Sequence, residues 1–71
     1  MSRVLADIIK GKWRELVGTA RVVWDELTVA ELIGSEGDTQ KLANLIQERY
    51  QMTHEEAEKQ VISFFERSRT L

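Results

Sequence analysis

The feature that most constrains the fold is an apolar stripe near the N-terminus with steps of three and four residues. Its members are Leu5, Ile8, Ile9, Trp13, Leu16, Val17, Ala20, Val23, Trp24 and Leu27. Such spacing is typical of an amphipathic helix, because residues three and four apart share one face. Trp13 and Trp24 are separated by close to three helical turns, so both lie on that face. We predict that both tryptophans are core residues.

Two glycines fall off this stripe. Gly11 and Gly18 each cost about 1 kcal/mol relative to alanine inside a helix. Gly18 is interpreted either as a kink or as a place where another helix comes close. We predict one long N-terminal helix, and the alternative is a break into two helices near Gly18.

The sequence predicts three further helix starts between Thr28 and the C-terminus. Thr28 with Glu31, and Thr53 with Glu56, have the spacing of capping boxes, in which the two side chains satisfy each other's backbone amides. Asp38 or Thr39 is the expected cap of the helix between them, and Gly34 is expected to end the short helix that Thr28 opens. The residues expected to face the core from the last two helices are Leu42, Leu45, Ile46, Tyr50, Ala57, Val61, Phe64 and Phe65.

These patterns predict a single all-α domain over residues 1–71, a small bundle of about four helices with a long N-terminal helix. The chain has no proline to break a helix and no cysteine to form a disulfide. A chain of this length is near the lower limit for one self-sufficient core, so each large apolar residue matters. No secretory signal and no apolar run of about 18 residues is visible, so we expect a cytoplasmic protein without a transmembrane segment.

The sequence offers little for catalysis or metal binding. His54 is the only histidine, and Glu58 four residues later gives at most two ligands from one helix, with no thiolate to complete a site. We therefore interpret His54 as an exposed first-turn residue. Ser35 and Ser63 lack a nucleophile motif and a partner base. We expect no catalytic residue, no cofactor and no metal, and hence not an enzyme.

One charged pattern is a candidate for partner binding. Residues 1–24 carry a net charge of +3 and residues 25–71 a net charge of −5. The spacing predicts a basic ridge along one side of the N-terminal helix, formed by Arg3, Lys10, Arg14 and Arg21. Such a ridge suits the phosphates of nucleic acid or an anionic lipid surface. The alternative is a solvated face whose long side chains cover the edge of the core, and the acidic overall charge disfavours a dedicated nucleic-acid binder.

The chain also resembles the CsbD-like family of small bacterial proteins. The residues that carry the resemblance, in order, are Trp13, Gly18, Trp24, Leu27, Thr28, Gly34, Leu42, the segment IQERY at 46–50, Ala57, Glu58, Val61 and Phe64. The resemblance covers most of the chain. Four places depart from the family's usual pattern: Asp25, Asn44 and Gln51 replace glycines, and Val29 with Ala30 replaces an acidic pair.

This resemblance implies a compact helical bundle shaped like a sterile-alpha-motif domain and a link to the bacterial general stress response. It implies no catalytic activity and no cofactor. The function that we expect is therefore a non-enzymatic stress-associated protein, a monomer or weak dimer, that binds a macromolecule. The alternative functions are a nucleic-acid-binding module that uses the basic ridge, and an interfacial membrane anchor, which requires the face of Trp13 and Trp24 to be free.

Overall fold

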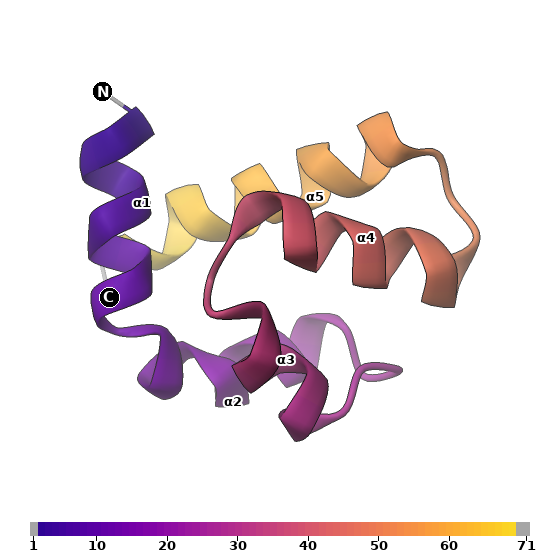
Figure 1. Cartoon of the computed structure of the whole chain (residues 1–71), viewed down its shortest axis with the longest axis horizontal. Coiled ribbons are helices and arrows are strands. Elements are labelled where there is room, and N and C mark those ends of the chain that lie inside the picture. The colour runs from indigo at the N-terminus through magenta and orange to yellow at the C-terminus, as the bar shows by residue number, and fades with distance from the viewer. Residues whose placement is uncertain (1, 70–71) are drawn as a thin grey trace.

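The computed structural model describes the backbone of residues 2–69 and the side chains of residues 7–69. Within this range the chain is helical and contains no strand, which confirms the all-α fold class. There are five helices rather than about four: α1 (Ser2–Gly11), α2 (Trp13–Val23), α3 (Val29–Ser35), α4 (Thr39–Tyr50) and α5 (His54–Ser68). In Figure 1, α4 and α5 lie side by side, α2 and α3 lie below them, and α1 stands across one end beside α5.

The prediction of one long N-terminal helix was wrong. The helix breaks at Lys12, where φ is −120° and ψ is 23°, and α2 starts at the next residue. The alternative break near Gly18 was also misplaced, because Gly18 lies inside α2. Gly11 supplies the flexible residue at the break. The break changes the direction of the chain, so that α1 packs on α5 while α2 packs on α3 and also places Trp13 against Phe64 and Phe65 of α5.

The predicted helix starts are confirmed. The Thr28 hydroxyl accepts from the Glu31 amide at 3.1 Å, and the Glu31 carboxylate accepts from the Thr28 amide at 3.0 Å. Thr53 and Glu56 exchange the same two bonds, both at 3.1 Å. Asp38 caps α4 by accepting from two backbone amides of its first turn. These local signals are read correctly from the sequence because each cap involves only a few consecutive residues.

Gly34 does not end α3, contrary to prediction. The helix continues to Ser35, whose buried hydroxyl donates to the Leu32 carbonyl at 2.7 Å. Glu36 takes the left-handed conformation instead, at φ 59°, and Gly37 follows at φ 72°. The positive φ favours glycine at position 37, where a Cβ would lie in van der Waals contact with Ile9 and Trp13 at 3.4 Å.

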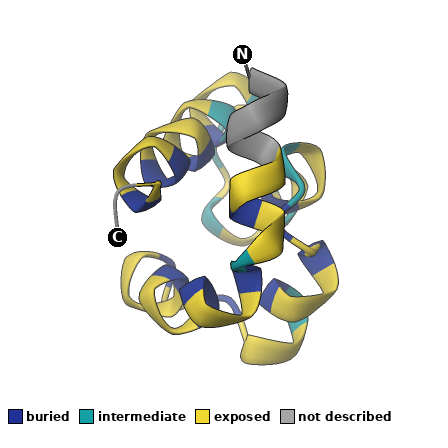
Figure 2. Cartoon of the chain, turned by 90° about the vertical axis from the view of Figure 1, so that its left-hand side faces the viewer, coloured by how far each residue is buried: buried dark blue, intermediate teal, exposed yellow. Residues whose placement is uncertain are grey.

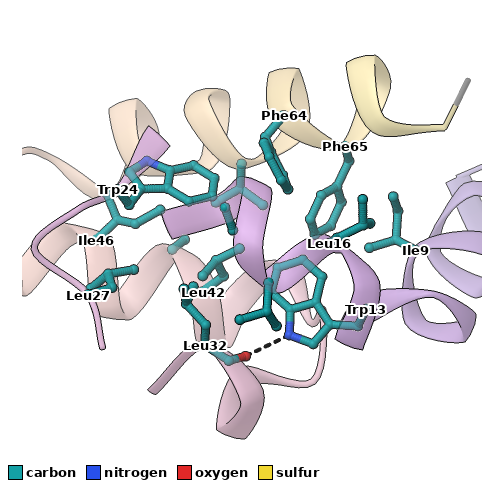
Figure 3. Packing of buried hydrophobic residues seen from close by; sticks show 14 of the residues in the cluster. Ile9, Trp13, Leu16, Trp24, Leu27, Leu32, Leu42, Ile46, Phe64 and Phe65 are labelled. Carbon is teal, nitrogen blue, oxygen red and sulfur yellow. Dashed lines mark hydrogen bonds between the residues drawn. The ribbon is translucent and has the colours of Figure 1, made fainter. Parts of the chain in front are cut away.

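The core is one cluster to which all five helices contribute (Figures 2 and 3). Its members are Ile9, Trp13, Leu16, Val17, Ala20, Trp24, Leu27, Leu32, Leu42, Ala43, Ile46, Ala57, Val61, Phe64 and Phe65. Both tryptophans are buried, as predicted, with 4% and 2% of their surface exposed. Four of the expected core residues whose side chains are described lie at its edge: Ile8 and Val23 are exposed, and Leu45 and Tyr50 are only partly buried.

Gly18 and Gly34 have no packing role, because a Cβ at either position meets nothing within 4 Å. Replacing either with alanine should therefore stabilise the fold by about 0.5–1 kcal/mol, since alanine loses less backbone entropy in a helix. The melting temperature should rise by roughly 2–8 °C in a thermal scan followed by circular dichroism. Gly37→Ala is the contrasting variant and should lower the melting temperature, because Gly37 has a positive φ of 72°. A loss of stability in Gly18→Ala would contradict the open environment seen here.

Candidate functional site

The break at Lys12 reshapes the predicted basic ridge. Lys10 lies in the last turn of α1, whereas Arg14 and Arg21 lie on α2, and all three side chains are exposed. The side chain of Arg3 lies outside the described residues. Because α1 and α2 run in different directions (Figure 1), the ridge is not the single straight row that one helix would give. Arg14 and Arg21 remain together on one side of α2, two turns apart.

An open cleft of about 680 Å³ lies where the two parts of the ridge meet. Lys10 and Arg14 line it together with the half-exposed side chain of Ile33. Two acidic residues in the lining already have partners: Glu36 pairs with Lys41 at 3.2 Å, and Asp38 caps α4. Glu15, in the first turn of α2, is the third acidic residue of the lining.

The described cations of the ridge, Lys10, Arg14 and Arg21, differ from several others in the protein in forming no ion pair with a carboxylate within residues 7–69. Lys41, Arg49 and Arg69 form ion pairs with glutamates. Within residues 7–69, no ion pair joins Lys10, Arg14 or Arg21 to a carboxylate. Their charges are therefore available to an anionic partner.

A second polar cluster, here called the Arg49–Tyr50 anchor, fastens the loop between α2 and α3 to the end of α4. The Arg49 guanidinium donates to the Glu26 carbonyl at 2.6 Å and pairs with Glu31. The Tyr50 hydroxyl accepts from the Glu26 amide at 3.0 Å and donates to Asp25 at 3.2 Å. Residues far apart in sequence thus fix the loop that follows Trp24.

The anchor also sets the ionisation of its members. Hydrogen bonds from the Thr28 amide and then from Arg49 lower the pKa of Glu31 below its ordinary value. The same pairing raises the pKa of Arg49, and burial raises the pKa of the Tyr50 phenol. Glu31 and Arg49 therefore stay charged at neutral pH, as their pairing requires.

The lowered pKa of Glu31 predicts a pH dependence of stability. A carboxyl whose pKa is lower in the folded state stabilises the protein above its unfolded pKa, and this stabilisation is lost as the pH falls through the folded pKa. Glu31→Gln should therefore lower the melting temperature at neutral pH, and the difference from wild type should shrink in acid. Glu55→Gln, at an exposed first-turn position of α5, is the control. If the difference in melting temperature between Glu31→Gln and wild type were the same at every pH, this account would be contradicted.

His54 belongs to a third polar cluster, between α4 and α5. Its Nδ1 is 2.9 Å from the Gln47 side-chain oxygen, and its Nε2 is 3.1 Å from that of Gln40. Glu58, the second hypothetical metal ligand, lies 3.7 Å from Nε2 and accepts from Gln40 at 2.6 Å. The described part of the chain contains no group of three or more histidine, cysteine, aspartate or glutamate residues arranged to hold a metal ion. These contacts join two helices.

The burial of both indoles removes one of the functional hypotheses. Trp13 donates to the Leu32 carbonyl at 2.6 Å, and Trp24 donates to the Gln60 side-chain oxygen at 3.0 Å. Neither ring is free to enter a lipid interface, so the interfacial anchor that depended on them is wrong. Among the described residues, no helix is long and apolar enough to span a bilayer.

Comparison with known proteins places the chain in a family. UPF0337 proteins of Bordetella pertussis and Bordetella parapertussis are each 50% identical to it over 62 residues, which cover 87% of this chain and 94% of theirs. A UPF0337 protein of Pseudomonas aeruginosa is 39% identical over 62 residues, with 87% and 95% covered. The chain belongs to the UPF0337 family, also known as CsbD-like. No family model matches the chain, and no solved structure matches it.

The structure explains several residues by which the chain resembles CsbD-like proteins. Thr28 opens α3, while Arg49 and Tyr50 of the IQERY segment form the anchor. Gln51 ends α4 in the left-handed conformation at φ 53°, which costs a non-glycine residue roughly 1–2 kcal/mol. These motif residues therefore build the fold. Sequence reasoning missed the anchor because its partners are about 20 or more residues apart, at separations that no local pattern encodes.

Proposed function

We propose that this UPF0337 protein is a non-enzymatic member of the bacterial general stress response that acts by binding a macromolecule with an anionic surface. The observation that carries the binding proposal is the set of exposed cations Lys10, Arg14 and Arg21 on α1 and α2, which form no ion pair with a carboxylate within residues 7–69. The link to stress is supported by the resemblance to CsbD-like proteins. The names of the relatives specify neither an activity nor a partner.

Several arrangements support a role without catalysis. Gln40 and Gln47 hold His54, and the Ser35 hydroxyl is committed to the Leu32 carbonyl. Most of the described acidic residues serve as caps, ion pairs or parts of the anchor. The proposal includes a cytoplasmic monomer or weak dimer with a sterile-alpha-motif-like arrangement, which a solution structure and sedimentation analysis would test.

The ridge variant Lys10→Gln/Arg14→Gln/Arg21→Gln tests the binding proposal. Because exposed charges contribute little to stability, its melting temperature should stay within a few degrees of wild type. In affinity capture from stressed cells at low salt, it should lose the anionic macromolecules that wild type retains. Wild type should release them at moderate salt, since screening weakens contacts between exposed charges.

The matched control is Lys41→Gln/Lys59→Gln/Arg69→Gln, which makes the same change in net charge on α4 and α5 and beyond the end of α5. This control variant should capture the same anionic macromolecules as wild type. Equal capture by wild type and the ridge variant would contradict binding through the ridge. Protein abundance that does not change between stressed and unstressed bacteria would contradict the link to stress.

A further inference from the structure

Gly18 is a residue of the α2 surface whose identity the packing of the fold does not require. It lies in the middle of the helix, is exposed, and has open space where a Cβ would stand. Alanine at this position would favour the helix without a clash. A glycine that packing does not require, on an exposed helix surface, suits a place where a partner approaches the backbone closely.

Two of the neighbours of Gly18 on this surface are cations, and a third, Glu15, is acidic. Arg14 precedes Gly18 by four residues and Arg21 follows it by three, so both arginines and Gly18 lie on one strip of α2. At 1.5 Å per residue, the two arginines are about 10.5 Å apart along the helix axis. The strip therefore has a residue without a side chain at its centre and an arginine at each end. Within residues 7–69, no ion pair joins either arginine to a carboxylate.

We propose that this strip, Arg14–Gly18–Arg21, docks the sugar–phosphate backbone of double-stranded DNA, with Gly18 at the point of closest approach. This inference rests on the proposed binding function and names its partner. The two arginines, about 10.5 Å apart along the helix axis, can contact phosphates on either side of the point where Gly18 meets this backbone. Lys10 adds a charge where α1 meets α2, beside Arg14 in the cleft.

The burial of the aromatic residues favours a duplex over a single strand. Single-stranded nucleic acid is bound largely by stacking its bases on exposed aromatic rings. Here Trp13, Trp24, Phe64 and Phe65 are buried, and the Tyr50 hydroxyl is held by the anchor. The described surface therefore offers charge for a phosphate backbone and no platform for unpaired bases.

The same burial disfavours a membrane. Interfacial binding requires large apolar side chains that enter the lipid, and the large apolar residues of α2 face the core. The half-exposed or exposed apolar residues nearby are small or branched, such as Val22 and Ile33. Duplex DNA carries one charge per about 1.7 Å of its axis, which suits a surface that offers cations without large apolar side chains.

The test measures binding of purified protein to a labelled mixed-sequence DNA duplex over a series of salt concentrations. Wild type should bind at low salt and lose affinity steeply as salt rises. Arg14→Gln/Arg21→Gln should bind less tightly, with a slope of log affinity against log salt that is shallower by about 0.9 for each phosphate that the variant no longer neutralises. Lys41→Gln/Lys59→Gln is the charge-matched control and should behave as wild type.

Gly18→Ala is the decisive variant, because its two expected effects have opposite signs. The melting temperature should rise, and duplex affinity should fall several-fold, since the added methyl group holds the DNA away from the helix. Gly34→Ala, on α3, should raise the melting temperature and leave affinity unchanged. If Gly18→Ala binds the duplex as tightly as wild type, the docking strip is overturned.

Two further probes separate this inference from the broader proposal. Binding of the matching single strand as tight as that of the duplex would overturn the choice of partner, as would preferential binding to vesicles of anionic phospholipid. Wild type that fails to bind duplex DNA at low salt, yet captures another macromolecule through the ridge, would overturn this inference and leave the proposed function standing. Absence of ridge-dependent capture would overturn both.

Discussion

Trp13→Ala should destabilise the protein by about 3–5 kcal/mol. The indole is buried, contacts Phe64 and Phe65 edge to face at ring-centroid distances of 6.4 and 6.2 Å, and donates to the Leu32 carbonyl (Figure 3). Alanine removes all of these interactions and leaves a cavity. A chain of this length has a total stability of roughly 4–11 kcal/mol, so the variant should melt roughly 12–40 °C below wild type or fail to fold.

Trp13→Phe separates the ring from its hydrogen bond. Phenylalanine keeps most of the aromatic packing but cannot donate to the Leu32 carbonyl, which still accepts from Ser35. The expected loss is smaller, about 1–3 kcal/mol, from the hydrogen bond and the reduced volume. Denaturant titrations of the three proteins provide the measurement. A melting temperature for Trp13→Ala within a few degrees of wild type would show that this tryptophan is a surface residue.

Phe64→Ala should have an effect of similar size, about 3–5 kcal/mol. Phe64 stands between the two tryptophans: its ring centroid is 5.0 Å from that of Trp24 and 6.4 Å from that of Trp13. It therefore joins α5 to both ends of α2. Its loss should lower stability and also change the tryptophan emission of any protein that remains folded, because both indoles lose a neighbour.

The control for this variant is Phe64→Leu, which fills part of the volume without an aromatic ring. It should cost about 1–2 kcal/mol, less than the alanine variant. Ile62→Ala, on the exposed side of the same helix, should change the melting temperature little. If Phe64→Ala were no more destabilising than Ile62→Ala, the central position of Phe64 would be incorrect.

The candidate site could be predicted from the sequence only in part. The spacing of Lys10, Arg14 and Arg21 identified exposed cations, because polar positions of an amphipathic helix face away from its apolar stripe. Their arrangement in space could not be predicted, since it depends on the direction in which α1 leaves α2. That these cations form no ion pair among residues 7–69 could be known only from the fold, because it places the carboxylates of the other helices.

The sequence by itself determined the elements whose causes are local. Thr28, Asp38 and Thr53 start helices because each cap is made with amides two or three residues away, and Trp13 and Trp24 are core residues because they share one helical face. Hydrophobic periodicity is a property of neighbouring residues, so it does not depend on contacts with distant parts of the chain.

Only the tertiary structure decided where the first helix breaks and how its two parts are held. The apolar stripe runs unbroken across Lys12, so local pattern favours continuity; the break forms because α1 packs on α5 and α2 packs on α3 in different directions. The end of α3 at Glu36, the Arg49–Tyr50 anchor and the open surface around Gly18 likewise depend on segments distant in sequence. Burial of a shared core outweighs the small local preferences that a sequence displays, because helix propensities differ by less than about 1 kcal/mol per residue while each large buried side chain contributes several times that.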